Sequence, residues 1–353
     1  MQNSHNQYPI SPSPHPPTNR SLPIIGITMG DPTGIGPEII VKALSTKELY
    51  QVCRPIVFGD REVLLKAAEM QSLSIVVVLL EKIPEDGYLP GRIFLYSLSQ
   101  LDPAFLRFGQ PDRECGLAMV RYIEEAVKWV RSGQVDAITT CPINKKAINE
   151  AGHPFSGHTE LLAHLVQAPS VAMMFVGSQW KVVLVTTHLP IKEVSKWITR
   201  DRVLSTFRLT DEGLKNYFEI THPKIAVLGL NPHCGEEGLL GDEERLEIVP
   251  AIMEARFQGL EVEGPFPADS FFNPSSPNPF DAVVSMYHDQ GLIPMKVSDF
   301  REAINLTLGL PLIRTSVGHG TAYDIAGKGL ADPTNLIKAV QLASKLSKLK
   351  RNY

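Results

Sequence analysis

Cysteine is scarce in this chain of 353 residues, which contains only four cysteines in all. They stand at positions 53, 115, 141 and 234, and no two of them share the C-x-x-C spacing of a redox or zinc motif. Neither a disulfide framework nor a thiolate metal cluster is therefore expected. Reduced thiols of this kind are typical of a cytoplasmic protein, so the cytoplasm is the predicted location.

Long hydrophobic runs and an excess of one charge are also missing. The longest aliphatic run covers residues 75–80, far short of the ~20 apolar residues that a membrane-spanning helix needs. The formal net charge is −4, and the basic residues are dispersed along the chain, which argues against a nucleic-acid-binding face. Neither a membrane nor a nucleic acid is expected as a partner.

A Rossmann fingerprint is absent as well. The loop from Met29 to Glu38 carries glycines at positions 30, 34 and 36, a spacing that does not fit G-x-G-x-x-G. A glycine-rich loop between a strand and a helix still has two roles open to it, an anion or nucleotide cradle and a tight turn. The sequence alone does not choose between them.

The composition and the pattern of the chain predict an α/β protein. The length allows two domains, because a single core stops growing near ~250–300 residues. Residues 1–22 are rich in Pro, Ser and Asn, which predicts a disordered tail rather than a signal peptide. From residue 23 to about 150, β-prone runs alternate with helical patterns, including a helix over 116–131, which predicts a mostly parallel sheet covered by helices. Residues 171–187 predict a hairpin.

The stretch from Asp281 to Asp332 organises the rest of the chain. Its apolar run 282–287 predicts a buried strand, with His288 and Asp289 just past the carboxyl end, where α/β proteins bind ligands. The second half of the stretch repeats this pattern with Arg314 and His319. A hydrophobic core does not need cationic or metal-binding side chains at two strand ends, so this pattern indicates a functional site.

Three histidines, His188, His233 and His288, each follow an apolar β-prone run by a residue or two. One such histidine alone is typically a hydrogen-bonded loop residue, but three at equivalent positions suit a divalent metal with an open coordination position. Asp269 and Asp289 could hold the imidazole N–H groups. Cys234 is the alternative soft ligand, and the spacing matches no local metal motif.

A second group of residues suits a phosphate or a carboxylate. Arg314 supplies a bidentate fork and Lys296 a point charge, while His158 and Thr159 stand at a predicted helix start, where N–H groups favour an anion. A solvated surface charge is the plain alternative. It fits Arg314 least, because this arginine follows a strand-like apolar run, where an unpaired charge is costly.

Taken together, these residues resemble the 4-hydroxythreonine-4-phosphate dehydrogenase family of vitamin B6 biosynthesis. The resemblance implies a three-layer α/β/α fold of the isocitrate/isopropylmalate dehydrogenase type, with two domains and a cleft between them. The first domain, on the nucleotide side, would comprise residues 23–150 and 297–353, and the second, on the metal and dimer side, residues 151–296. The matching segments are GDPTGIGPE, TTCPINKKA, SGHTELLA, TTHLPI, GLNPHCGEEG, GPFPADSFF, MYHDQGLIPMK and NLTLGLPLIRTSVGHGTAYDIAGKG.

The same resemblance implies the roles of individual residues. The three histidines would bind one divalent metal (Zn²⁺, Mg²⁺ or Co²⁺), with one of them crossing the interface of a homodimer. Lys296, Asp269 and Asp289 fall on positions that serve catalysis or maintain the site, and the segment from His319 onward belongs to an NAD or NADP site. The implied substrate-binding residues are His158, Thr159, Lys296, Asn305 and Arg314, and the implied cofactor-binding residues are His319, Gly320, Asp324 and Gly327.

The implied reaction is the oxidation of 4-phosphooxy-L-threonine to 2-amino-3-oxo-4-phosphooxybutanoate, which loses CO₂ to give 3-amino-2-oxopropyl phosphate. The general base stays open between water at the metal, Asp269 and Lys296. Three other readings also stay open. They are a dehydrogenase of D-threonate or D-erythronate 4-phosphate, a phosphate acetyltransferase-like transferase, and a non-catalytic protein that binds metal and anion.

Overall fold

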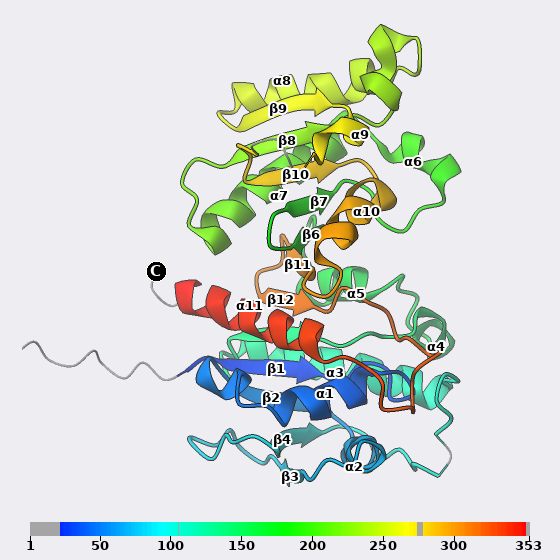
Figure 1. The fold of residues 1–353 in the computed structure, drawn as a ribbon, viewed down its shortest axis with the longest axis vertical. Helices are drawn as coiled ribbons and strands as arrows, with labels where there is room; N and C mark the ends of the chain where they lie inside the picture. Colours follow the sequence, from blue (N-terminus) through cyan, green and yellow to red (C-terminus); the bar gives the residue numbers. More distant parts are fainter. Residues whose placement is uncertain (1–21, 105, 274–277, 351–353) are drawn as a thin grey trace, which may run out of the picture.

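The computed structural model describes residues 22–104, 106–273 and 278–350. Its twelve strands form one sheet in the order β3-β4-β2-β1-β5-β12-β11-β6-β7-β10-β8-β9. Figure 1 shows this sheet running along the long axis of the molecule, from β3 at one end to β9 at the other. The disordered tail predicted for residues 1–22 lies outside the described residues except for Leu22.

One half of the sheet is parallel throughout, as the alternation of strands and helices predicts. β12 comes from the far end of the chain and pairs with β5, so the two chain ends build this half together. The sequence pattern did not reveal β4, a short strand that begins with an arginine. The strands are β1 (Ile24–Thr28), β2 (Arg54–Gly59), β3 (Val76–Leu79), β4 (Arg92–Ser97), β5 (Ala137–Thr140) and β12 (Ile313–Ser316).

The helices of this half begin where the sequence provides caps. The carboxylate of Asp112 accepts a hydrogen bond from the backbone N–H of Cys115 at 2.9 Å, so α3 starts a little before the predicted residue 116. α11 packs on β12, β5 and β1. The helices are α1 (Gly36–Leu44), α2 (Arg61–Met70), α3 (Arg113–Arg131), α4 (Lys145–Glu150), α5 (His158–Val166) and α11 (Thr334–Lys350), with a 3₁₀ turn at Leu49–Gln51.

The other half of the sheet mixes directions. β6 and β7 form the predicted antiparallel hairpin, and β7, β10, β8 and β9 are parallel neighbours. Its strands are β6 (Ala172–Val176), β7 (Lys181–Leu184), β8 (Lys224–Leu228), β9 (Glu261–Phe266), β10 (Ala282–Ser285) and β11 (Ile304–Leu308). Its helices are α6 (Ile191–Trp197), α7 (Arg200–Phe218), α8 (Val249–Phe257), α9 (Ala268–Phe271) and α10 (His288–Asp299). A segment with 3₁₀ turns lies at Pro232–Gly238 and a π-helical turn at Glu244–Ile248.

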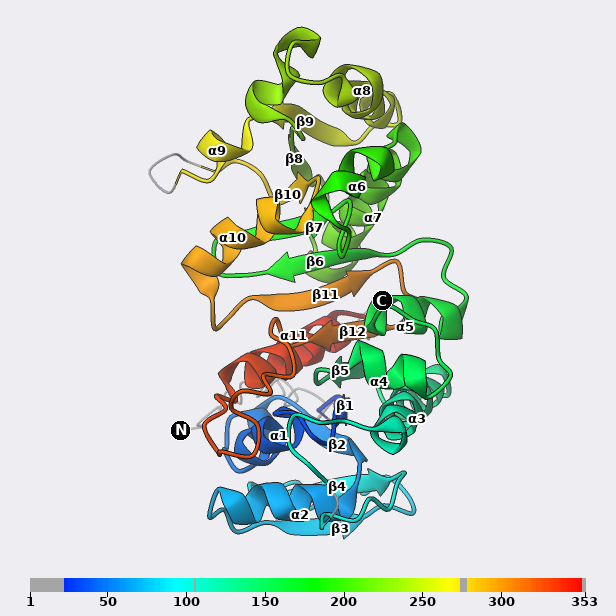
Figure 2. The ribbon, with the colours of Figure 1, turned by 90° about the vertical axis from the view of Figure 1, so that its right-hand side faces the viewer.

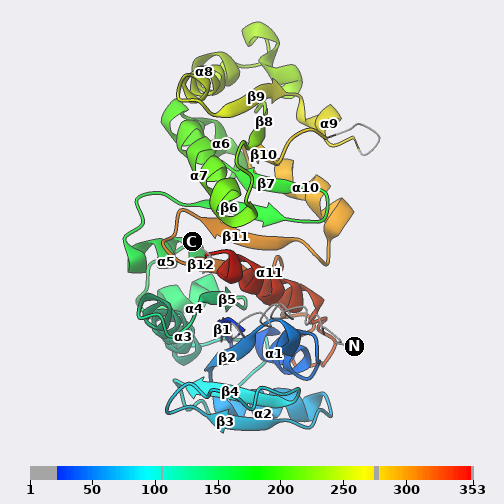
Figure 3. The ribbon, with the colours of Figure 1, turned by 90° about the vertical axis from the view of Figure 1, so that its left-hand side faces the viewer.

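Helices lie on both sides of the sheet, as the two perpendicular views show (Figures 2 and 3). The three-layer α/β/α class is thereby confirmed. The sheet is continuous across the predicted domain boundary, because β11 pairs antiparallel with β6 over residues 304–308. The boundary at residues 296 and 297 falls inside α10, and the division into two domains stays a prediction. Over the described ranges, no helix has the length and apolar character needed to cross a membrane.

The glycine-rich loop between β1 and α1 is a tight turn rather than an open cradle. Residues 29–38 are all buried. A Cβ on Gly30 would lie 2.3 Å from the carbonyl oxygen of Pro142, and one on Gly36 would lie 2.2 Å from that of Met29. These glycines are therefore needed for close packing of backbone on backbone.

Candidate active site

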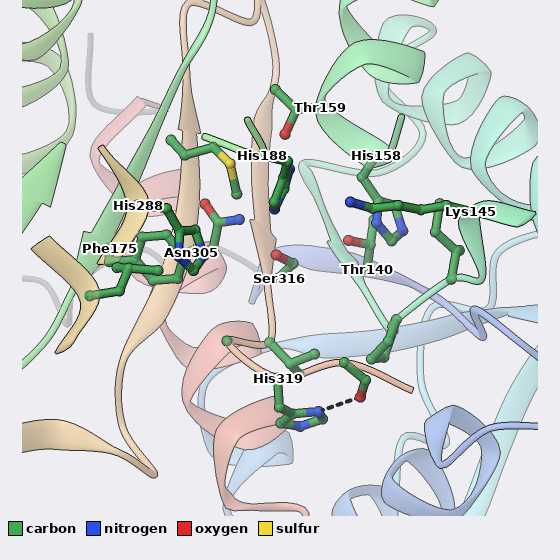
Figure 4. Close-up of a pocket in the computed structure, with 18 of the residues that line it drawn as sticks. Thr140, Lys145, His158, Thr159, Phe175, His188, His288, Asn305, Ser316 and His319 are labelled. Carbon is green, nitrogen blue, oxygen red and sulfur yellow. Dashed lines mark hydrogen bonds between the residues drawn. The ribbon is translucent and has the colours of Figure 1, made fainter. Parts of the chain in front are cut away.

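A pocket opens where the two halves of the sheet meet, at the ends of β5, β11 and β12 and beside α5 and α10. It gathers most of the predicted site residues, which the sequence spreads from position 158 to position 320. Figure 4 shows His158, Lys145 and Thr140 on one side of it, His288 and Asn305 on the other, and His188 and Ser316 between them. The predicted residues that line it are His158, Thr159, His188, His288, Lys296, Asn305, Arg314, His319 and Gly320.

Arg314 is the most unusual residue of the pocket. Its side chain is only 2% exposed, and its guanidinium donates hydrogen bonds to the hydroxyls of Thr140 (2.7 and 3.2 Å) and Thr307 (2.9 Å). Within the described residues it forms no ion pair. Burial lowers the pKa of Arg314, and the charge of Glu160 opposes this shift. Because a guanidinium keeps its proton near neutrality, the pocket contains a buried cation that lacks an acidic partner.

His158 and Asn305 present unpaired polar atoms beside this cation. The Nε2 of His158 and the Oδ1 of Asn305 are buried, and neither atom has a hydrogen-bond partner among the described residues. Burial holds the pKa of His158 well below its ordinary value, and the charges of Arg314 and Lys145 add to the shift. The imidazole is therefore neutral at pH 7. Buried polar atoms are nearly always paired in folded proteins, so these two atoms indicate a polar ligand.

His188 and His288 face each other in the pocket, with ring centroids 5.8 Å apart. The Nδ1 of His288 lies 2.7 Å from the carboxylate of Asp289, which orients this ring and leaves its Nε2 for a ligand. Burial lowers the pKa of His188, as do the charges of Lys145 and His288, while Glu160 opposes the shift. The neutral imidazole is the form that binds metal ions.

His233 and Asp269 lie apart from these residues. His233 lines neither of the two pockets that His188 and His288 line, and Asp269 lies close enough to Cys234 for its charge to raise the pKa of that thiol. Over the described residues, no three His, Cys, Asp or Glu side chains are arranged to hold a metal ion. One chain therefore brings together two of the three predicted imidazoles. The predicted metal role of the three histidines stays a prediction.

The backbone that carries His233 is strained. Residues 233–237 all have positive φ angles, and only one of the five is a glycine. Left-handed backbone costs a non-glycine residue roughly 1–2 kcal/mol. The turn is held by Glu244, which is 4% exposed and accepts hydrogen bonds from the backbone N–H groups of Leu230 and Asn231 at 2.7 Å each. Strain of this kind is typical of functional turns.

The predicted cofactor residues lie in the loop between β12 and α11. In the described part of the chain, the Nε2 of His319 is buried without a hydrogen-bond partner, and Gly320 has open space on the side where a Cβ would stand. Gly327 packs against the ring of Phe108 and donates its N–H to Glu38 at 2.6 Å, and Asp324 is exposed. The loop therefore borders the pocket at His319 and Gly320 and continues along α1.

Four polar residues that line the pocket were not among the site residues predicted from the sequence. Thr140 ends β5 and Lys145 begins α4, Glu160 lies in the first turn of α5, and Ser316 ends β12. Thr140 and Lys145 belong to the polar segment TTCPINKK, which begins with the last two residues of a buried strand. The rule that ligands bind past the carboxyl ends of parallel strands could have singled them out.

An open α/β sheet has here a pocket with two facing imidazoles and a buried arginine that forms no ion pair with any described residue. This arrangement suits an enzyme for a small anionic substrate. The family model described as "Pyridoxal phosphate biosynthetic protein PdxA" matches residues 51–343. The chain belongs to this family, whose named relatives are dehydrogenases, and it is therefore an oxidoreductase.

Curated relatives match along most of the chain. A 4-hydroxythreonine-4-phosphate dehydrogenase of Desulforapulum autotrophicum is 50% identical over 322 residues, which cover 91% of this chain and 95% of the relative. A D-threonate 4-phosphate dehydrogenase of Cupriavidus necator is 44% identical over 327 residues, covering 92% and 98%. The crystal structure of a 4-hydroxythreonine-4-phosphate dehydrogenase from Klebsiella pneumoniae superposes with a TM-score of 0.83 at 38% identity, covering 92% and 99%.

Proposed function

We propose that the protein oxidises the secondary alcohol of 4-phosphooxy-L-threonine with NAD or NADP as the hydride acceptor. The product would be 2-amino-3-oxo-4-phosphooxybutanoate, a 3-oxo acid that loses CO₂ readily because the carbanion formed is an enolate. The observation that carries the proposal is the buried Arg314, whose charge forms no ion pair with any residue that the structure describes. Membership of the family and the names of the relatives support the choice of substrate.

Binding of the phosphate falls to the residues around Arg314. An arginine binds a phosphate through two parallel N–H groups, and Arg314 already has its Nη atoms directed by Thr140 and Thr307. The neutral ring of His158 can donate one hydrogen bond, and the hydroxyl of Thr159 can donate another. These contacts fix one end of the substrate, so that its reacting carbon points in a single direction.

A divalent cation fits the side of the pocket that holds His188 and His288. Both rings are at the pocket, and His288 has its second nitrogen engaged by Asp289, an arrangement common among metal-binding histidines. When bound, such a cation would lower the pKa of the substrate alcohol. The third imidazole would be His233 from a second copy of the chain, since His233 lies outside the pocket of its own chain.

The surface around these residues supports a homodimer. Ile293 and Val297 on α10 are 61% and 83% exposed, and Phe300, which caps the end of this helix, is 74% exposed. The three residues follow one another at helical spacing. Leu239, directly after the strained turn, is 78% exposed. Large apolar side chains on a solvent face are typical of protein interfaces. A second copy that covers them would bring its own strained turn toward the pocket.

Lys296 and the loop after β12 complete the site. Lys296 lines the pocket on α10. Burial lowers the pKa of His319, and the charge of Lys296 adds to this shift. Lys296 can bind the substrate carboxylate or accept the alcohol proton, and Asp269 would reach the same alcohol together with His233 of the second copy. The nicotinamide would enter at His319 and Gly320, where a buried Nε2 has no partner among the described residues.

The test is an absorbance assay for reduced nicotinamide. The protein would be given 4-phosphooxy-L-threonine, each of the two nicotinamides, and Zn²⁺, Mg²⁺ or Co²⁺ in turn. Turnover that depends on the metal and on the phosphorylated amino acid is expected. No turnover under any combination would overturn the proposal.

A second candidate substrate is D-threonate 4-phosphate. The relative from Cupriavidus necator carries that name at 44% identity, and the phosphate and imidazole groups of the pocket suit either compound. The two substrates differ at the amino group, which the hydroxy acid lacks. A kcat/KM at least tenfold higher for the hydroxy acid than for the amino acid would select this candidate.

A further inference from the structure

Lys145 occupies a position in the pocket that the sequence pattern did not assign. It begins α4, lines the pocket beside His158 and Thr140 (Figure 4), and its Cε lies 3.7 Å from the place of a Cβ on Gly157. Its ammonium forms no ion pair within the described part of the chain. The next residue, Lys146, pairs with Glu150 at 3.6 Å, and its side chain is 85% exposed.

The charge of Lys145 reaches both rings on this side of the pocket. The pKa of His158 is lowered mainly by burial, then by the charge of Arg314 and then by that of Lys145. The pKa of His188 is lowered mainly by burial and then by the charge of Lys145. Glu160 is the acid that faces the same space, and its charge acts on Arg314 and His188 without forming an ion pair with either cation in the described structure. Three cationic side chains (Lys145, Lys296 and Arg314) and the carboxylate of Glu160 leave a net positive pocket, which suits an anion of higher charge.

A chain of hydrogen bonds fixes the backbone from which Lys145 extends. The Oδ1 of Asn144 accepts the N–H of Ala147 at 2.8 Å and caps α4, while its Nδ2 donates to the hydroxyl of Tyr323 at 2.6 Å. That hydroxyl donates to the carboxylate of Asp31, which is fully buried and also accepts two hydrogen bonds from Thr33 at 2.8 Å. The buried carboxylate thus anchors the start of α4.

We propose that Lys145 is a further substrate-binding residue, which together with Arg314 holds the phosphate group, and that the chain Asp31–Tyr323–Asn144 positions it. This inference rests on the proposed function only in taking the substrate to be phosphorylated. A lysine beside an arginine adds a point charge to the bidentate guanidinium, and the oxygens of a phosphate dianion can accept hydrogen bonds from both side chains. Tyr323 lies in the loop after β12, so the same chain links the phosphate end of the pocket to the predicted cofactor loop.

The test measures the binding of inorganic phosphate, which needs no turnover. The dissociation constant would be obtained from the rise of the melting temperature with phosphate concentration, at fixed ionic strength, for the wild type and four variants. Lys145→Met is expected to weaken phosphate binding at least tenfold, and Lys145→Arg to restore it to within about threefold. Lys146→Met, the matched control, is expected to bind as the wild type does.

The positioning half of the inference has its own variant. Tyr323→Phe removes the hydroxyl that joins Asn144 to Asp31 and is expected to weaken phosphate binding about threefold while the protein stays folded. Unchanged binding in this variant would overturn the positioning role. Unchanged binding in Lys145→Met, or an equal loss in Lys146→Met, would overturn the binding role. A protein that binds phosphate through Lys145 but oxidises no phosphorylated substrate would overturn the proposed function alone.

Discussion

The rings of His188 and His288 lie 5.8 Å apart, centroid to centroid, although one follows β7 and the other begins α10. β7 and β10 are parallel neighbours, so both side chains leave the sheet at the same edge. β8 is the next strand in the sheet and leads to His233, yet the strained turn after β8 directs this residue elsewhere. One chain therefore brings together two of the three histidines that are predicted to bind a metal.

Mixing two inactive variants is expected to restore activity. In a twofold dimer whose sites combine His188 of one chain with His233 of the other, His188→Ala and His233→Ala form heterodimers with one intact site. An equal mixture would then regain about a quarter of the wild-type rate if subunits exchange freely. The matched control mixes His188→Ala with His288→Ala, which leaves no site intact. Recovery in the control, or none in the first mixture, contradicts a shared site.

Arg314→Met is expected to separate stability from function. The change removes a buried charge without an acidic partner, so the free energy of unfolding should stay the same or rise by about 1–2 kcal/mol. The same change removes the fork that binds the phosphate, so KM should rise on the order of a hundredfold. Urea unfolding and steady-state kinetics measure the two effects. Arg301→Met, on an exposed residue, serves as the control, and a large loss of stability in Arg314→Met would contradict the argument.

The ligand-free protein is expected to become less stable as the pH falls below 6.5. Burial holds the pKa of His158 well below the ordinary value of 6.5, so below that pH the unfolded chain binds more protons than the folded one. The stability contributed by the neutral ring is thus fully present above pH 6.5 and is lost progressively as the pH falls below it. His158→Gln should show a smaller pH slope between pH 5 and 6.5 than the wild type, and His222→Gln, in an exposed loop, the same slope as the wild type. Equal slopes in all three proteins would count against the prediction.

Glu244→Gln is expected to weaken metal binding from a distance. The carboxylate of Glu244 holds the strained turn through the N–H groups of Leu230 and Asn231, and a loosened turn would no longer hold His233 in one orientation. An affinity for Co²⁺ about tenfold lower is expected from an optical titration of the wild type and the variant. Glu243→Gln is the control, because among the described residues Glu243 accepts a hydrogen bond from the side-chain amide of Asn231 and none from the backbone of the turn. Identical Co²⁺ affinities in all three proteins would refute the link.

Much of the fold follows from local signals in the sequence. The parallel half of the sheet, the hairpin of β6 and β7, and the helix start at His158 were all predicted, because apolar runs and helix starts depend on neighbouring residues. The meeting of Arg314, His158 and His188 was predictable in outline. His188 follows the strand β7, so the rule that ligands bind past the carboxyl ends of strands applies to it. Arg314 lies inside β12, and it was singled out because an unpaired charge within an apolar run is costly.

The remaining features depend on residues far apart in the chain. Whether the loop 29–38 is a cradle or a tight turn is decided by Pro142 and Thr321, which fill the space beside Gly30 and Gly34. The left-handed turn after β8 contains a single central glycine, so backbone preference alone would not indicate it. Its conformation depends on Glu244, which a pattern of neighbouring residues cannot reveal.

The pairing of β11 with β6 bears on how the molecule can move. Hinged enzymes commonly bend at a loop that joins two separate bodies, but here five consecutive residue pairs of β11 and β6 join the two predicted domains. Asn305 lies on β11 itself, and Arg314 lies on the neighbouring strand β12. Any rocking of the two predicted domains must therefore twist the sheet itself, and the groups proposed to bind the phosphate stand close to the axis of that twist. Asn305 and Arg314 would keep their distance from each other while the outer residues of the pocket move apart and together.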